Sequence, residues 1–274
     1  MYHLTKQIKK MKKIIITVFA GLLFIISCKK NVVTTETSNK TKEVIAEKTF
    51  AEKIEIAHNK NNFLKQEAIQ FDALIEFGGN EIFNANITIS TTSDIAKIAY
   101  KNGDFMYVDK QNVFVSPSLK DNSGVRFHAY TWSYFFLYPY KLSDHGTKWD
   151  DNFKTSEANN SFNTAKLSFE ANTGDAPDDW YIVYTNKDNN MLDHVAYIVT
   201  AGKTKAEAEA DPHAIKYLDY KQIDGVPFAT NWEFLEWGLE KGLTKKIGSG
   251  KITNIKFVTG FRNSFTIPKD FIKK

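Results

Sequence analysis

The sequence predicts a mainly β protein with one large antiparallel sheet that is strongly curved or forms an open barrel. Two observations lead to this fold class. Apolar and polar residues alternate with a period of two along many short segments of the chain. Turns that contain asparagine or glycine separate these segments at short intervals, as expected for strands joined by tight hairpins. About ten strands can be counted, and their close succession favours an antiparallel meander over a βαβ architecture.

The first elements of the folded part show a helical period and then a period of two. Between residues 49 and 62, apolar side chains recur at helical spacing among Lys and Glu, which predicts an amphipathic N-terminal helix. From residue 68 to 77 the period changes to two. Gly78-Gly79 predicts a turn into a second alternating segment, residues 83–90. These segments predict a β-hairpin with one buried and one solvent-facing side.

Later strands differ from this hairpin because both of their sides are apolar. In the segment 180–184, Trp180, Ile182 and Tyr184 face one side, whereas Tyr181 and Val183 face the other. Both faces of the sheet must therefore be covered here. Further turns are predicted at Asn102-Gly103, Lys187 to Asn190 and Asp224-Gly225.

The densest aromatic segment of the chain spans residues 127–142, and eight of the fourteen residues from Phe127 to Tyr140 are aromatic. It shows no period of two, and Pro139 should end any helix near Tyr138. We expect a short apolar helix over residues 128–138 that covers the concave side of the sheet. The alternative is that these side chains only fill the core, as clusters of aromatic residues commonly do.

Composition excludes several classes of protein. With 42% hydrophobic residues, 14% aromatic residues and one cysteine, the chain is neither disordered nor a small disulfide-stabilised protein. The net charge of +4 arises at the N-terminus, because residues 1–27 contain five lysines and no acid. Downstream, 31 basic residues stand against 32 acidic ones. Nucleic acid is therefore not an expected partner.

The N-terminus predicts export and lipidation. Residues 14–27 form an uncharged apolar run of fourteen, shorter than the roughly twenty residues of a membrane-spanning helix, which identifies residues 1–27 as a signal peptide. The following Ile25-Ile26-Ser27-Cys28 resembles the lipobox of bacterial lipoproteins, in which the cysteine is acylated and becomes the new N-terminus. Cys28 is the only cysteine. The alternative is an ordinary signal peptide or a short anchor with an incidental cysteine.

Residues 28–47, rich in Thr, Lys and Glu, are predicted to form a flexible tether to a single domain, residues 48–274.

The sequence contains no motif of a catalytic or metal site that we recognise. Gly248-Ser249-Gly250-Lys251 resembles the end of a phosphate-binding loop, but Ile252 replaces the required Ser or Thr, so we interpret it as a glycine-containing turn. Adjacent residues of a strand point to opposite faces, so neighbouring Asp and His side chains should not share an ion. This applies to Asp193-His194; Asp144-His145 and Asp211-Pro212-His213 also lack metal-ligand spacing. We expect no catalytic residue, no cofactor and no metal, although 32 acidic residues leave a carboxylate pair open.

Three segments resemble a known family. Residues 132–146 (WSYFFLYPYKLSDHG), Trp180-Tyr181 and 220–227 (YKQIDGVP) resemble uncharacterised bacterial lipoproteins related to the periplasmic lipoprotein-carrier (lipoprotein localisation factor) superfamily, and the likeness spans residues 48–272. The resemblance implies a half-barrel of about eleven strands whose concave apolar face is covered by short helices and accepts acyl chains.

Two features depart from the carriers of that superfamily. Soluble carriers lack a lipid anchor, so a lipidated Cys28 is more similar to the acceptor type in the outer membrane. The arginine that holds the carrier's lid closed has no counterpart that can be matched to either Arg126 or Arg262, the two arginines of this chain. Transfer of lipoproteins is therefore not implied by the resemblance.

The leading functional hypothesis is a non-enzymatic lipoprotein of the bacterial cell envelope, anchored in the outer membrane, that binds a lipid or acyl chain in the cavity of the curved sheet. A protein–protein interaction or assembly module in the envelope is the first alternative. An envelope hydrolase with a carboxylate pair is the second. The predicted lining residues are Phe71, Trp132, Phe135, Phe136, Trp180 and Tyr197.

Overall fold

The computed structural model describes residues 47–155 and 161–274. The predicted signal peptide, Cys28 and the tether up to residue 46 lie outside the described residues. The described residues belong to one compact unit, Ala46–Lys274. Within them, no helix combines the length and the apolar character needed to cross a bilayer.

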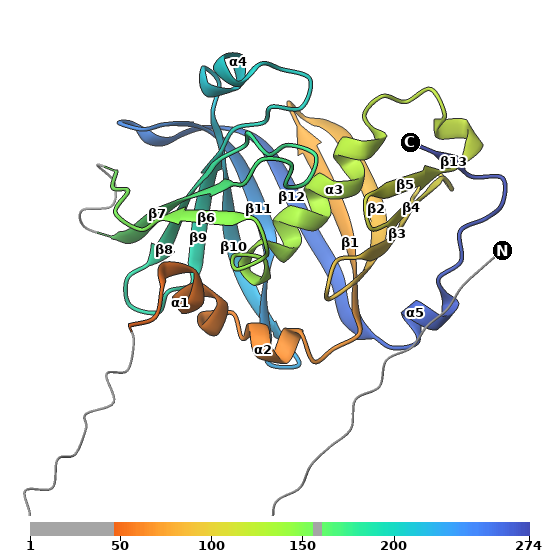
Figure 1. Ribbon diagram of the computed structural model, residues 1–274, viewed down its shortest axis with the longest axis horizontal. Helices are drawn as coiled ribbons and strands as arrows, with labels where there is room; N and C mark the ends of the chain where they lie inside the picture. Colours follow the sequence, from red (N-terminus) through yellow and green to blue (C-terminus); the bar gives the residue numbers. More distant parts are fainter. Residues whose placement is uncertain (1–46, 156–160) are drawn as a thin grey trace, which may run out of the picture. The chain divides into compact units, whose positions relative to one another are not determined.

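The described residues form one open antiparallel sheet of thirteen strands in the order β13-β5-β4-β3-β2-β1-β12-β11-β10-β9-β8-β7-β6 (Figure 1). Most neighbours in the sheet are also neighbours in the chain, except that β1 pairs with β12 and β5 pairs with β13. The strands are β1 (Ala68–Phe77), β2 (Asn80–Ser90), β3 (Ile95–Tyr100), β4 (Phe105–Asp109), β5 (Asn112–Val115), β6 (Thr147–Asp150), β7 (Phe162–Phe169), β8 (Tyr181–Asn186), β9 (Leu192–Tyr197), β10 (His213–Ile223), β11 (Val226–Gly238), β12 (Gly242–Val258) and β13 (Ile272–Lys273).

This architecture confirms the predicted fold class, a mainly β protein with a curved antiparallel sheet. The strand number exceeds the ten to eleven expected because short strands extend the sheet at both ends. β5 and β6 have four residues each and β13 has two. Segments this short contain too few alternating positions to be recognised from the sequence.

Few helices accompany the sheet, and all are short. They are α1 (Phe50–Ala57), α2 (Lys60–Phe63), α3 (Val125–Leu137), α4 (Lys205–Glu209) and α5 (Phe261–Ser264), with 3-10 turns η1 (Pro117–Leu119) and η2 (Tyr138–Tyr140). The predicted N-terminal helix is present as α1 and α2. Thr49 and Glu52 form a capping box at its start, and Asn59 interrupts it with a left-handed backbone, φ 54°.

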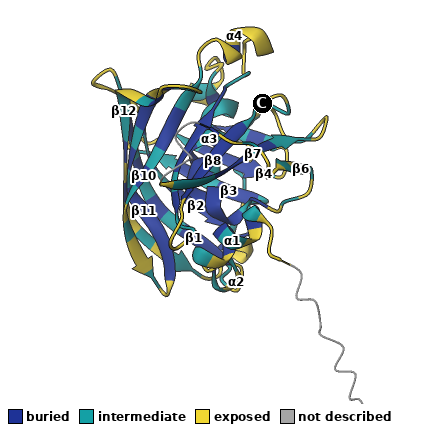
Figure 2. Cartoon of the chain, turned by 90° about the vertical axis from the view of Figure 1, so that its left-hand side faces the viewer, coloured by how far each residue is buried: buried dark blue, intermediate teal, exposed yellow. Residues whose placement is uncertain are grey.

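The β1–β2 hairpin has the predicted facing. Apolar side chains of β1 and β2 enter the main core, and Phe71 lies opposite Ile87 in the ladder. Gly78 and Gly79 form the turn with positive φ angles of 56° and 79°. The buried residues follow the strands, whereas exposed ones gather at turns, strand ends and α4 (Figure 2).

The later strands are covered on both faces, as predicted. Tyr181 and Val183 belong to the main core, whereas Ile182 and Tyr184 belong to a separate cluster on the opposite face. The aromatic segment 127–142 covers only the first of these faces. The second cluster is completed by side chains from outside that segment: Phe153, Phe162, Trp180, Trp237 and Leu243.

One predicted turn is wrong. Gly248-Ser249-Gly250-Lys251 lies inside β12 and pairs with β1 on one side and β11 on the other. Glycine is needed at positions 248 and 250 because a side chain there would clash with neighbouring atoms. A Cβ atom on Gly250 would lie 2.8 Å from Cε3 of Trp232, and one on Gly248 would lie 2.6 Å from the carbonyl oxygen of Glu76.

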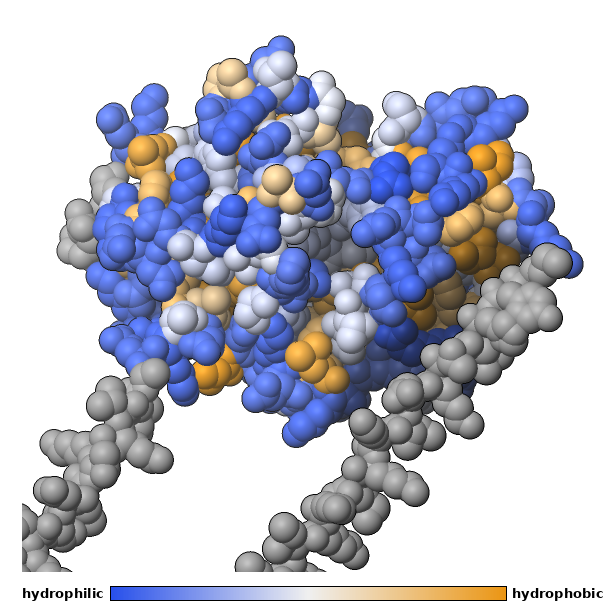
Figure 3. All heavy atoms as spheres, viewed as in Figure 1, coloured by the Kyte–Doolittle hydropathy of each residue, from blue (hydrophilic) through white to orange (hydrophobic). Residues whose placement is uncertain are grey.

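On the face shown in Figure 3, hydrophobic side chains appear as separate patches among hydrophilic ones. The exposed large hydrophobic residues within the described chain are Ile56, Leu64, Ile82 and Leu239. They come from α1, the α2–β1 connection, β2 and the β11–β12 turn, so they do not belong to one element.

Candidate functional site

The candidate site lies where α3 crosses the concave side of the sheet (Figure 1). The segment from Val125 to Leu137 contains neither Gly nor Pro, so helix can form without interruption. The helix begins three residues before the predicted start at residue 128, and the 3-10 turn η2, which contains Pro139, replaces it after Leu137. Apolar side chains surround most of α3, as expected for a largely buried helix.

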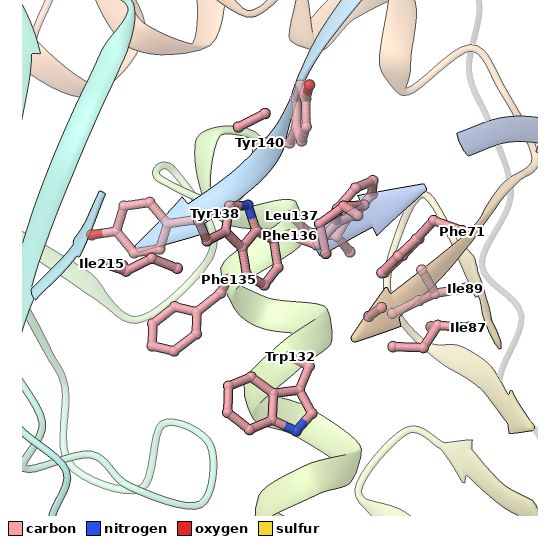
Figure 4. Packing of buried hydrophobic residues seen from close by; sticks show 14 of the residues in the cluster. Phe71, Ile87, Ile89, Trp132, Phe135, Phe136, Leu137, Tyr138, Tyr140 and Ile215 are labelled. Carbon is pink, nitrogen blue, oxygen red and sulfur yellow. The ribbon is translucent and has the colours of Figure 1, made fainter. Parts of the chain in front are cut away.

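Aromatic side chains of α3 interlock with those of the sheet. The rings of Phe136 and Phe71 stack with centroids 3.7 Å apart, and Phe136 also stacks on Phe228 at 5.1 Å. The ring centroids of Phe135 and Tyr197 are 5.0 Å apart. In Figure 4 these α3 side chains extend between Ile215 on one side and Phe71, Ile87 and Ile89 on the other. Contacts of this kind contribute about 0.5–1.5 kcal/mol per pair beyond the burial of area.

The structure brings five of the six predicted lining residues together. Phe71, Trp132, Phe135, Phe136 and Tyr197 are all buried in the main core, each at most 6% exposed. Trp180 does not join them. It packs on the opposite face of the sheet, with its ring centroid 6.3 Å from that of Trp237.

The prediction for Trp180 differs from the structure because the six predicted lining residues included side chains from both faces of the sheet. Alternation already put Trp180 and Tyr181 on opposite sides, and only the structure shows that the side of Tyr181 is the concave one.

Polar contacts fasten α3 mainly at its two ends. Near the N-terminus, the Arg126 guanidinium forms two hydrogen bonds with the Asp175 carboxylate, at 2.9 and 2.8 Å. Arg126 also donates to the backbone carbonyls of Gln111 and Lys274. Near the C-terminus, the Tyr217 hydroxyl donates to the Phe135 carbonyl at 3.0 Å. In the middle of α3, the Tyr130 hydroxyl donates to the Lys110 carbonyl at 3.4 Å, and the other contacts with the sheet are mainly apolar.

The two arginines of the chain, Arg126 and Arg262, lie on different helices. Arg126 lies on the covering helix itself. Arg262 lies on α5, where its guanidinium binds Asp94 and holds the pKa of that carboxyl well below its usual value.

Several buried polar atoms in this region lack a hydrogen-bond partner among the described residues. They are Oγ of Ser133, Oη of Tyr138 and Nε1 of Trp232. An unpaired buried donor or acceptor costs about 1–3 kcal/mol, so each of these atoms is a place where a polar group of a ligand would gain binding energy. Two belong to α3 and η2, and the third belongs to β11.

The space between α3 and the sheet is almost filled in this structure. Next to Phe136, Tyr217 and Trp232 remains a cavity of about 10 Å³, enough for one water molecule at most. An acyl chain could therefore enter only if α3 or its side chains move.

The chemistry of the site is apolar and uncharged. Burial raises the pKa of Tyr138, Tyr181 and Tyr217 well above the ordinary value, so these phenols stay neutral. Glu55 is the only buried carboxylate of the described chain, and its Oε1 lies 2.7 Å from Nζ of Lys60.

Histidine and acidic side chains do not assemble into a metal site in the described part of the chain, where no three such ligands converge. Asp193 and His194 nevertheless touch. The carboxylate of Asp193 reaches around the strand to Nδ1 of His194, at 2.7 Å, although the two residues are neighbours in β9. This contact differs from the expectation that alternation keeps them apart.

Sequence reasoning missed the contribution of β10 and β11. Tyr217, Phe228, Trp232 and Phe234 are buried in the main core, where they face α3 or its neighbours. The alternation of large apolar residues between positions 226 and 234 was a signal that could have found the three residues of β11.

No protein-family model matches this chain, and no curated protein matches it by sequence. Among solved structures, a LolA superfamily protein from Nitrosomonas europaea aligns with a TM-score of 0.53 at 10% identity, over 80% of this chain and 99% of that chain. The fold is LolA-like. This agrees with the resemblance to lipoprotein carriers seen in the sequence, at the level of the fold.

Two further structures align less closely. A DUF1329 family protein from Desulfovibrio piger has a TM-score of 0.47 at 8% identity, over 78% of this chain and 95% of that one. A putative outer membrane lipoprotein-sorting protein domain from Vibrio parahaemolyticus has a TM-score of 0.46 at 14% identity, over 77% and 94%.

Proposed function

We propose that this protein is a lipoprotein of the cell envelope that binds a lipid or acyl chain between α3 and the concave face of its LolA-like sheet. The observation that carries the proposal is the aromatic interior under α3, which combines apolar walls with three unpaired polar atoms. Apolar walls with a few convergent polar groups are typical of small-molecule sites. The proposal includes cleavage of the signal peptide, lipidation of Cys28 and a location at the outer membrane.

The proposed mechanism is displacement of α3. Because the site has almost no free volume, the ligand must replace contacts that α3 now makes, such as the stack of Phe136 on Phe71. Burial of the ligand's apolar surface contributes about 25 cal/mol per Å² and offsets the loss of these contacts. A polar headgroup or ester would pair with the Ser133 or Tyr138 hydroxyl.

Native mass spectrometry of the delipidated protein with palmitate and with phosphatidylethanolamine tests the proposal. We expect a one-to-one complex with at least one of them. We also expect faster hydrogen exchange over residues 125–137 when the ligand is bound. If neither complex forms, the proposal is wrong.

Two tryptophan variants locate the ligand. Trp132 and Trp180 lie on opposite faces of the sheet. The change in tryptophan emission on adding the ligand should be smaller in Trp132→Phe than in the wild type, with Trp232 in the same cluster giving the remaining change. In the matched control, Trp180→Phe, it should be unchanged. The opposite pattern would place the ligand outside the concave site.

The alternatives are less well supported. Glu55 is the single buried carboxylate of the described chain and is engaged by Lys60, so no buried carboxylate pair favours a hydrolase there. Binding of a protein partner remains an alternative that cross-linking in intact cells can test.

A further inference from the structure

A second cavity lies on the face of the sheet opposite to α3. After β12, the C-terminal segment passes through α5 and returns along the sheet to β13 (Figure 1). Its residues Phe261 and Phe265 pack against Ala68 and Ile95, which alternate with the concave side chains of their strands. Between this segment and the sheet is a groove of about 330 Å³. That is close to the lower end of the range for small-molecule sites, roughly 300–1,000 Å³.

The floor of the groove is one row of side chains across four strands. Gln70 is opposite Thr88, Thr88 is opposite Lys97, and Lys97 is opposite Tyr107 in successive ladders. Paired positions in neighbouring strands place their side chains on the same face. The amide of Gln70 donates to the Thr88 hydroxyl at 2.9 Å, which fixes the polar end of the row.

Aromatic rings form the other end of the groove. Tyr107 contacts Phe265 edge to face, with ring centroids 5.6 Å apart, and Phe261 contacts Phe265 at 5.7 Å. The remaining lining residues, Val258, Thr259 and Ser264, add one apolar and two hydroxyl side chains. The groove therefore has an apolar end and a polar end.

Among the described residues that line the groove, Lys97 is the only charged one. Its ammonium lies 5.2 Å from the ring centroid of Phe105 and 5.9 Å from that of Tyr107, and it makes no ion pair within the described residues. Two carboxylates near the C-terminal segment are engaged elsewhere. Asp94 binds Arg262, and Glu67 accepts hydrogen bonds from the backbone of Gly260 and Arg262. The positive charge of Lys97 is thus available to an anionic ligand.

We propose that this groove binds a small carboxylic acid with an aromatic or short aliphatic body. The ammonium of Lys97 and the hydroxyl of Thr88 would donate to the carboxylate, while the body of the ligand packs against Tyr107 and Phe265. This site is on the other face from α3, so the proposal does not depend on lipid binding.

Calorimetric titration of the full chain with 3-phenylpropanoate tests the site. We expect saturable one-to-one binding, and binding at least about tenfold weaker for the neutral comparator 3-phenylpropanol, because the charge-assisted hydrogen bond is lost. Lys97→Met should weaken binding of the acid to the same extent, and Lys97→Arg should retain it. The matched control is Lys251→Met, which removes an exposed lysine of β12 that does not line the groove.

Hydrogen exchange locates the ligand. The acid should protect peptides from β2–β4 and residues 259–265 and leave α3 unchanged. Absence of saturable binding, undiminished binding to Lys97→Met with a native urea midpoint, or protection confined to α3 would each overturn the proposal. None of these results bears on lipid binding at the concave site, which has its own test.

Discussion

Individual glycines decide whether the aromatic residues of the core fit. β12 carries Gly248 and Gly250 where its neighbours carry large rings, and Gly250 lies opposite Trp232 in the ladder with β11. A Cβ atom on Gly250 would come within 2.8 Å of Trp232 and 3.1 Å of Ile75. Cores packed at this density tolerate little added volume.

We therefore expect Gly250→Ala to lower the free energy of unfolding by about 1–3 kcal/mol, as overpacking of a core does. Urea unfolding measures it. Gly238→Ala is the matched control, because a Cβ atom there meets nothing closer than the Lys241 Cβ at 3.8 Å. Equal effects of the two substitutions would contradict the steric explanation.

His58 is a second residue with a specific consequence. It is fully buried at the end of α1, where its Nδ1 lies 2.9 Å from the Ile54 carbonyl oxygen and its ring packs edge to face on Tyr140 and Tyr220. Burial lowers the pKa of His58 to about 4. The folded protein therefore holds a neutral imidazole over a pH range in which the unfolded chain is protonated.

This difference makes stability depend on pH. The unfolded histidine has a pKa near 6.5, so the contribution of His58 is fully present above about pH 6.5 and is lost as the pH falls towards 4. Between pH 7.5 and pH 5 we expect it to amount to roughly 2 kcal/mol. Urea unfolding at both pH values should show this loss in the wild type and a smaller one in His58→Gln. An equal loss in both proteins would assign the effect to other groups.

At the scale of elements, α3 combines the buried packing of a core helix with only a few polar contacts to the rest of the protein. It contacts the sheet mainly through aromatic side chains, and its polar attachments are Arg126, the Tyr130 hydroxyl and the Phe135 carbonyl. The N-cap residue Gly124 makes no side-chain cap. The first turn of α3 therefore depends strongly on Arg126.

Arg126→Ala should speed hydrogen exchange of the amides in residues 125–129 several-fold, because the contacts with Asp175, Gln111 and Lys274 are lost together. Global stability should change by less than about 1 kcal/mol, since the ion pair is partly exposed. Arg262→Ala removes the other arginine, on the opposite face, and should leave exchange in α3 as in the wild type. Exchange that is unchanged in Arg126→Ala would mean that packing alone holds this end.

At the scale of the whole molecule, lipid binding and lipid anchoring are separate properties. The first requires space under α3. The second requires acylation of Cys28, where two or three acyl chains at about 0.8 kcal/mol per buried CH₂ would give a stable anchor.

Labelling of cells with a palmitate analogue tests the anchor. We expect the wild type to be labelled and to sediment with membranes, and Cys28→Ala to lose both properties. Ser27→Ala, which keeps a small residue before the cysteine, should behave as the wild type does. Labelling that persists in Cys28→Ala would show that another residue carries the lipid.

Much of the fold could be predicted because its signals are local. Alternation along residues 68–77, the Gly78-Gly79 turn and Pro139 after an unbroken apolar run specify strand, turn and helix end from the chain itself. Short strands such as β13 carry no such signal. Gly248 and Gly250 were misread as a turn because their role depends on rings from two other strands.

By itself, the sequence determined the fold class, the paired faces of the strands and the apolar helix near residues 128–138. Only the tertiary structure decided which face is concave, and with it that Phe71 and Tyr197 face α3 whereas Trp180 does not. The physical reason is that alternation is a property of one strand, whereas curvature arises from the twist and pairing of all strands together. The same dependence on distant segments hid the groove at Lys97, whose walls come from five strands and the C-terminal segment.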